Sequence, residues 1–105
     1  MKLRVALLSL VAAAGLMAKN AEGVVMESNG SPVTGATVLL KGVTDSSVRS
    51  AVTREDGTFV FVGLSPEADY EVRARLGEKE TKPASISRFD NKVRKIELKF
   101  PADRK

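Results

Sequence analysis

The side chains best suited to chemistry lie in the stretch TREDGTFVFVGLSPEADYEVRA, residues 53–74. Glu55 and Asp56 bring two carboxylates together, and Asp45 or Asp69 could join them to bind a calcium ion. Such a site needs roughly six to eight oxygen atoms that converge on the cation. No loop here has the ligand spacing of an EF-hand, and aspartate is common in turns. The pattern therefore favours turn-forming aspartates over a metal site.

The aromatic residues are the second group with a chemical use, because exposed rings can stack on sugars. The chain has four phenylalanines, one tyrosine and no tryptophan. Four of the rings, Phe59, Phe61, Tyr70 and Phe100, fit the core or a corner of a small domain. Only Phe89, in SISRFDNK, is expected to be exposed, and it is the one candidate ligand contact. Phe89 could instead cap an open end of the core, so a carbohydrate-binding module is kept as the alternative function.

The inventory of reactive side chains argues against an enzyme. The sequence contains no histidine and no cysteine. An imidazole base, a thiolate nucleophile and the nitrogen and sulfur ligands of zinc are therefore all missing. The chain also lacks the Gly-x-Ser-x-Gly and Ser-x-x-Lys patterns of serine enzymes and a glycine-rich phosphate loop. We expect no catalytic residues, no metal and no cofactor.

The pattern of apolar residues predicts the elements that position these side chains. After residue 18, short β-branched or aromatic runs alternate with Gly, Pro, Asn and Asp at intervals of about ten residues. That spacing predicts an all-β fold, a single Greek-key-type β-sandwich of about seven strands, transthyretin-like or Ig-like. The strand candidates are GVVMES, GATVLLKG, VRSAVTRE, TFVFV, YEVRARL and KIELKF. The residues expected to face inward are Ala36, Val38, Leu40, Tyr70, Val72, Ala74, Leu76, Ile96, Leu98 and Phe100.

Two local signals define the stretch from residue 53 to residue 74. Asp56-Gly57 lies between two apolar runs and predicts a hairpin turn that joins them, because glycine tolerates a positive φ. Phe59 and Phe61 are two residues apart and so point to one face of a strand, where both are expected to be core. The spacing of Leu64, Pro66 and Tyr70 resembles a tyrosine corner, in which the phenol bonds to nearby backbone. This stretch is thus predicted to be scaffold.

The first eighteen residues read as a secretory signal peptide. Lys2 and Arg4 precede an apolar run that ends in small residues near Ala18, with cleavage after Gly15 or Ala18. The run is shorter than the roughly 20 apolar residues of a membrane span. We therefore expect residues 1–18 to be a signal peptide, residues 19–105 to form the β-sandwich domain, and no stable membrane span after cleavage.

Charge gives no reason to expect a nucleic-acid partner. The chain has 17 basic and 13 acidic residues, and without Lys2 and Arg4 the numbers are 15 and 13, or a net charge near +2. Nucleic-acid-binding domains carry a larger basic excess on one face. The basic residues near the end of the chain are interrupted by Asp90, Glu97 and Asp103, as expected for a solvated strand and tail.

Two segments, GVVMESNGSPVTGATVLLKG and TREDGTFVFVGLSPEADYEVRA, resemble the carboxypeptidase regulatory-like domain family. The first has the pattern glycine-x-valine followed by glycine-x-proline, a hydrophobe, x, glycine-alanine-x-valine. The second has Asp-Gly, two alternating aromatic residues, a leucine, and a proline before a tyrosine. The matching positions are Gly23, Val25, Gly30, Pro32, Val33, Gly35, Ala36, Val38, Asp56, Gly57, Phe59, Phe61, Leu64, Pro66 and Tyr70. The resemblance covers about residues 22–100.

The resemblance implies a transthyretin-like, non-catalytic sandwich of the kind found on exported or cell-surface bacterial proteins. One departure is Glu67-Ala68-Asp69, which stands where the family often has glycine and resembles the corner of a fibronectin type III domain. We expect a periplasmic or secreted module that acts in protein interaction or as a structural accessory at the cell envelope. Its partner is an unidentified protein or, in the alternative reading, a glycan. The outward charges expected to guard the sheet edges are Glu71, Arg73, Arg75, Lys95, Glu97 and Lys99.

Overall fold

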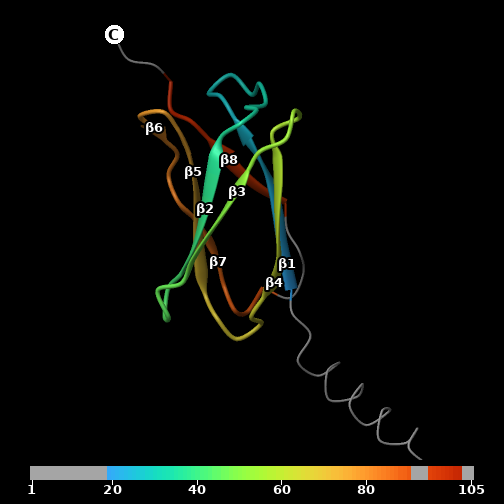
Figure 1. Cartoon of the computed structure of the whole chain (residues 1–105), viewed down its shortest axis with the longest axis vertical. Coiled ribbons are helices and arrows are strands. Elements are labelled where there is room, and N and C mark those ends of the chain that lie inside the picture. Colours follow the sequence, from blue (N-terminus) through green and yellow to red (C-terminus); the bar gives the residue numbers. More distant parts are fainter. Residues whose placement is uncertain (1–18, 91–94, 103–105) are drawn as a thin grey trace, which may run out of the picture.

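The computed structural model describes residues 19–90 and 95–102, and these form two β-sheets packed face to face (Figure 1). One sheet has the order β4-β1-β8, and the other has the order β3-β2-β5-β6, with β7 also pairing with β5. The strands are β1 (Lys19–Met26), β2 (Thr37–Gly42), β3 (Val48–Val52), β4 (Thr58–Leu64), β5 (Tyr70–Leu76), β6 (Lys79–Glu80), β7 (Ala84–Ile86) and β8 (Lys95–Lys99). The predicted all-β sandwich is confirmed. The expected signal peptide, residues 1–18, lies outside the described residues.

The core lies between the sheets and takes every second residue of each long strand, as period-two patterning requires. Phe59 and Phe61 are both 3% exposed, and their rings meet edge to face with centroids 6.0 Å apart. Edge-to-face contact is a favoured geometry for two aromatic rings. Leu64 is buried at the end of β4. The other residues buried among them are Ala21, Val25, Val33, Ala36, Val38, Leu40, Tyr70, Val72, Ala74, Ile86, Leu98 and Phe100.

Gly23 lets the central strand β1 approach both of its neighbours. A Cβ placed on Gly23 would come 2.7 Å from the ring of Phe59 on β4 and would collide with the carbonyl oxygen of Ile96 on β8. These separations are too short for non-bonded carbon atoms, so a side chain here would push the sheet apart. The glycine of the first sequence motif therefore has a packing function in the middle of the three-stranded sheet.

The prediction of a hairpin at Asp56-Gly57 is wrong in one respect. The turn exists: Gly57 has a φ of 81°, and its N–H donates to the carbonyl of Arg54 at 2.9 Å. However, β3 and β4 do not pair with each other, because they belong to different sheets. The residues between Val52 and Thr58 carry the chain across the sandwich. The Asp-Gly signal thus located a turn correctly and could not tell whether the flanking strands pair.

The tyrosine corner is confirmed. The backbone N–H of Ser65 donates to the phenol oxygen of Tyr70 at 2.9 Å, across the bend that joins β4 to β5. Tyr70 is 8% exposed, so its ring contributes to the core while its hydroxyl satisfies a backbone donor. This contact fixes the connection between the two sheets at one end of the molecule.

Candidate binding site on the open side of the sandwich

Two of the carboxylates considered as calcium ligands, Asp56 and Asp45, accept hydrogen bonds within their own turns. Asp56 Oδ1 accepts hydrogen bonds from the hydroxyl of Thr58 at 2.6 Å and from its backbone N–H at 3.1 Å. Both bonds hold the pKa of the Asp56 carboxyl below its ordinary value, and the bond from the hydroxyl has the larger effect. Asp45 accepts from the N–H and hydroxyl of Ser47 in the same way, and its pKa is lowered too. Within residues 19–90 and 95–102, no group of three acidic side chains converges.

Asp69 bonds to Arg88, in the turn that follows β7. Its Oδ1 accepts from the backbone N–H of Arg88 at 2.7 Å, and its Oδ2 lies 3.1 Å from Nη2 of the same arginine. The Arg88 guanidinium is the main reason that the pKa of Asp69 is lowered, and Asp69 in turn raises the pKa of Arg88. The pair ties the bend before β5 to the turn after β7.

Phe89 lies at the tip of this turn and is 81% exposed, as the sequence predicted. The turn is held by hydrogen bonds from the N–H of Ser87 to Asp90 Oδ2 and from the N–H of Asp90 to the carbonyl of Ser87, both at 3.0 Å. The guanidinium of Arg88 lies 6.0 Å from the centroid of the Phe89 ring. The other four aromatic rings are all buried. Phe89 is therefore a single exposed ring on a hydrogen-bonded turn, and none of the other four aromatic rings is exposed beside it.

The sandwich has two long sides where an edge of one sheet faces an edge of the other, and the side between β3 and β4 is closed. The turn at residues 53–57 joins these two edges directly. Arg49 of β3 reaches across, and its Nη2 donates to the carbonyl oxygen of Val62 on β4 at 2.9 Å. Its guanidinium also lies 5.8 Å from the centroid of the Phe61 ring. Arg49 thereby covers the core and occupies one acceptor of the β4 edge. We call this the closed side.

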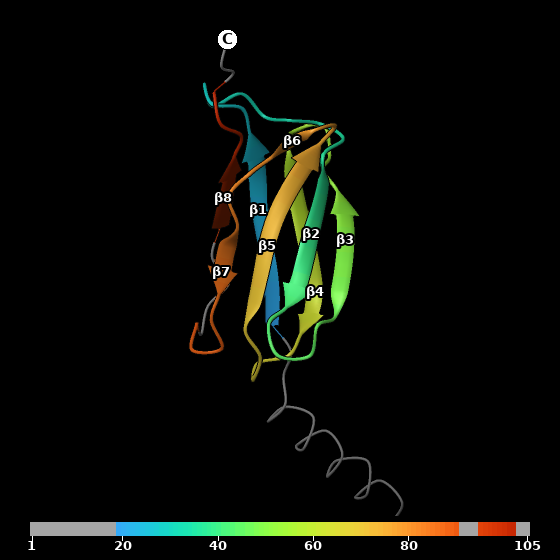
Figure 2. The same ribbon diagram turned by 90° about the vertical axis from the view of Figure 1, so that its left-hand side faces the viewer.

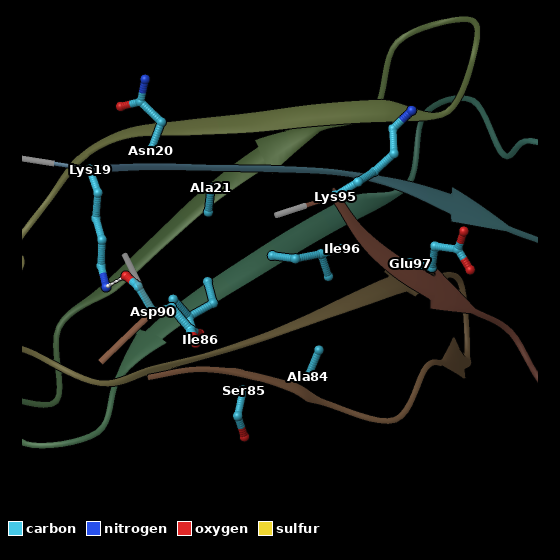
Figure 3. A pocket seen from close by; sticks show the side chains of 10 residues that line it. All are labelled: Lys19, Asn20, Ala21, Ala84, Ser85, Ile86, Asp90, Lys95, Ile96 and Glu97. Atoms are coloured by element: carbon cyan, nitrogen blue, oxygen red, sulfur yellow. Dashed lines mark hydrogen bonds between the residues drawn. The ribbon is translucent and has the colours of Figure 1, made fainter. Parts of the chain in front are cut away.

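On the opposite side, β8 lies across from the edge formed by β6 and β7 (Figure 2). Two cavities form a groove between these edges. A cavity of about 240 Å³ lies at one end, and Figure 3 shows Ala21, Ala84, Ile86 and Ile96 pointing into it. A second cavity of about 580 Å³ continues the groove past Pro83, Leu98 and Phe100. The two cavities meet at Ala84 and Glu97, which line both. We call this the open side.

Along this groove, none of the described strands pairs with the backbone of β8. β8 runs parallel to β1, and the N–H of Phe100 donates to the carbonyl of Met26 at 2.9 Å. Since successive residues of a strand direct their backbone groups to opposite sides, Ile96, Leu98 and Phe100 face β1. The N–H and C=O groups of Lys95, Glu97 and Lys99 therefore point away from β1, and among the described residues no strand pairs with them.

The other edge of the groove is interrupted. β6 and β7 are short and are separated by Thr81, Lys82 and Pro83. The buried hydroxyl of Thr81 accepts from the N–H of Ala74 at 3.0 Å and so replaces a backbone carbonyl in the pairing with β5. Pro83 has no N–H to donate. A proline and a break in pairing are recognised ways to keep an edge from accepting another strand. Of the two edges, β8 is therefore the one available for pairing.

Two lysines bridge the ends of the groove and leave its middle uncovered. Lys19 Nζ donates to the carbonyls of Ser87 at 2.9 Å and Asp90 at 3.1 Å, the second of which is drawn in Figure 3. At the other end, Lys79 Nζ lies 3.3 Å from Glu27 Oε1 and 5.4 Å from the centroid of the Phe100 ring. These contacts join the two ends of the β1 segment to the sheet that contains β6 and β7.

Sequence reasoning did not find this groove. It identified Lys95, Glu97 and Lys99 only as outward charges on a strand, which is where the structure has them. The cavities depend on β8 lying opposite β7, a tertiary arrangement without a local signal. Pro83 was the one available indication, because proline within a sheet is found mainly on edge strands or at the start of a strand.

Comparison with known proteins is consistent with this fold. The chain matches, at 19% sequence identity and a TM-score of 0.60, the major pilin subunit BcpA of Bacillus cereus, covering 80% of this chain and 30% of the pilin. A single-substitution variant of that subunit gives 18% identity, a TM-score of 0.61, and coverage of 82% and 30%. The chain thus spans about a third of the pilin's length. A comparison with curated protein sequences finds no match.

In the described part of the chain, no helix has the length and apolar character to span a bilayer. The family model of the carboxypeptidase regulatory-like domain matches residues 21–99, which include both sequence motifs and all eight strands apart from the first two residues of β1. This chain belongs to the carboxypeptidase regulatory-like domain family.

Proposed function

We propose that this domain is an exported, non-catalytic module of the bacterial cell envelope that binds another protein through the groove on its open side. The single observation that carries the proposal is the edge of β8, which pairs with no other strand of residues 19–90 and 95–102 and lies beside two apolar cavities. A strand edge left free in a small sandwich is a ready surface for association. The occurrence of the same fold in a protein named a pilin subunit supports a structural or accessory role.

A non-catalytic role is supported by the chemistry of the chain. The sequence contains no histidine and no cysteine. The carboxylates of Asp45, Asp56 and Asp69 accept hydrogen bonds from nearby groups, and each has a lowered pKa. A general base for work near neutral pH needs a pKa near the working pH, and these groups are shifted the other way.

Photo-crosslinking in the native host tests the proposal. A photoreactive side chain at Lys82, which lines the larger cavity, is expected to give a specific adduct with one protein. The matched control is the same group at Val52, which is 65% exposed on β3, at the opposite edge of the sheet that contains β6 and β7. Identical adducts from both positions, or none from Lys82, would contradict binding through the groove.

Export rests on the signal-peptide pattern of residues 1–18. N-terminal sequencing of the protein from envelope and culture fractions is expected to start at Leu16 or Lys19. A protein that retains Met1 in the cytoplasmic fraction would contradict this part of the proposal.

Carbohydrate binding is the second candidate function, and the exposed ring of Phe89 on its hydrogen-bonded turn is the observation in its favour. A glycan array probed with the full chain tests it. Reproducible binding that is lost in Phe89→Ala would favour a sugar ligand, and equal signals from both proteins would remove Phe89 from consideration.

A further inference from the structure

The groove combines a free strand edge, apolar cavities and an ordered set of charges. We propose that an extended segment of the partner adds as a strand to β8, with acidic, basic and acidic residues on its outer face and apolar residues between them. This inference rests on the proposed function and names the chemistry of the partner segment. Strand addition is an established mode of peptide recognition, in which backbone bonds give affinity and side-chain pockets give specificity.

Strand addition first requires backbone N–H and C=O groups that point toward the new strand. Lys95, Glu97 and Lys99 direct their N–H and C=O groups toward the groove side of β8, since Phe100 and its alternating neighbours bond to β1. A strand about 4.8 Å away would satisfy these groups. The edge of β7 across the groove is kept from this role by its short length and by Pro83.

The cavities supply the second requirement. Side chains of an added strand alternate between the two faces of its sheet, so every second one would point into the sandwich. A residue beside Ile96 would meet the smaller cavity with Ala84 and Ile86. A residue beside Leu98, about 7 Å further along, would meet the larger cavity with Pro83 and Phe100. Both linings favour apolar side chains.

The outer face supplies the third requirement. Lys95, Glu97 and Lys99 alternate in sign along one face of β8. Opposite charges across a strand pair stabilise it and like charges destabilise it. A matching segment therefore reads acidic, apolar, basic, apolar, acidic, which is the same in both strand directions. A second copy of β8 placed in antiparallel register about Glu97 would put Glu97 opposite Glu97 and lysine opposite lysine. The charges thus favour a foreign segment over that self-pairing.

A tethered strand tests the inference. The probe is the segment Glu-Val-Lys-Val-Glu-Val joined to the C-terminal end of the full chain by a Gly/Ser linker of about ten residues, which gives an effective concentration near millimolar. We expect the amide hydrogen exchange of Glu97 and Lys99 to slow by about tenfold or more. The amides of β4, on the closed side, serve as the internal control.

Two matched tethers control for the presence of extra chain. In one, lysine and glutamate are exchanged, and in the other, proline replaces each valine and so prevents a ladder. The inference is supported if the first tether protects the amides of Glu97 and Lys99, the charge-exchanged tether protects them less, and the proline tether does not protect them. Equal protection by both charged tethers would overturn its charge pattern. Unchanged exchange at Glu97 and Lys99 with every tether would overturn strand addition.

The outcomes separate this inference from the proposed function. A specific adduct at Lys82 without protection by any tether would mean that the groove binds a partner by side-chain contacts alone, so only the inference fails. If neither the specific adduct at Lys82 nor the protection by a tether is observed, the proposed function fails as well. If the free chain shows the same protection of Glu97 and Lys99, increasing with protein concentration and with dimer mass, pairing between two copies of β8 replaces the foreign segment.

Discussion

The two long sides of this sandwich differ in whether the facing edges of the two sheets are joined. On the closed side, the connection at residues 53–57 joins β3 to β4, and Arg49 bonds to the edge carbonyl of Val62. On the open side, Lys19 and Lys79 bridge the ends of the groove, and no strand within residues 19–90 and 95–102 pairs with the outward backbone groups of β8 beside two cavities. In the described part of the chain, the same fold therefore contains one pair of edges that is joined and one that is not, and we propose that another molecule binds at the second.

The largest expected difference between the sides concerns their aromatic rings. Phe61, under Arg49 on the closed side, is buried, and Phe61→Ala should lower the free energy of unfolding by about 3–5 kcal/mol. Phe89, on the turn of the open side, is exposed, and Phe89→Ala should change it by less than about 0.5 kcal/mol. Urea titration of both variants measures this. A loss below about 1 kcal/mol for Phe61→Ala would show that its ring is not core.

Two buried threonines give the next comparison. On the closed side, the Thr53 hydroxyl accepts from the N–H of Ala36 at 2.9 Å and donates to the carbonyl of Val33 at 2.7 Å. Thr53→Val leaves both groups without this partner and should cost about 1–3 kcal/mol in urea titration. Thr81→Val, at the interrupted edge of the open side, should cost less, because one of the two groups it frees, the carbonyl of the exposed Lys82, lies where water can reach it. Equal losses would contradict the difference in closure.

The bridge formed by Arg49 is expected to have a smaller effect. Its side chain is exposed, so Arg49→Met should lower stability by about 1 kcal/mol through loss of the bond to Val62 and the contact with Phe61. Arg54→Met, at an exposed position in the neighbouring turn, is the control and should change stability by less than about 0.5 kcal/mol. Similar thermal unfolding of both variants would show that Arg49 does not close this side.

Strand patterning explains why the core could be predicted from the sequence and the groove could not. Alternation placed Phe59, Phe61 and Tyr70 inside because burial follows period two within one strand. The Asp56-Gly57 signal specified a local φ and so located a turn, but strand pairing depends on distant residues, and the expected hairpin is absent. The cavities lie between β7 and β8, whose proximity is a property of the whole fold.

The smallest expected effect is the pH dependence of the turn that presents Phe89. The pKa of Asp69 is lowered by Arg88, so the ionised carboxyl stabilises the folded state. That contribution is fully present above the ordinary value of 3.8 and is lost as the pH falls through the lower folded pKa. Unfolding curves of the wild type and Asp69→Asn should therefore converge below about pH 3.8. If the difference in unfolding free energy between the two proteins stayed constant down to about pH 2, this coupling would be contradicted.

Amide hydrogen exchange along β8 in the free domain tests most directly whether the open side is available. The account predicts alternation: the amides of Leu98 and Phe100, which face β1, exchange slowly, and those of Glu97 and Lys99 exchange rapidly. Uniform slow exchange from Ile96 to Phe100 in dilute monomer would show that the edge of β8 is already covered, and would contradict the account.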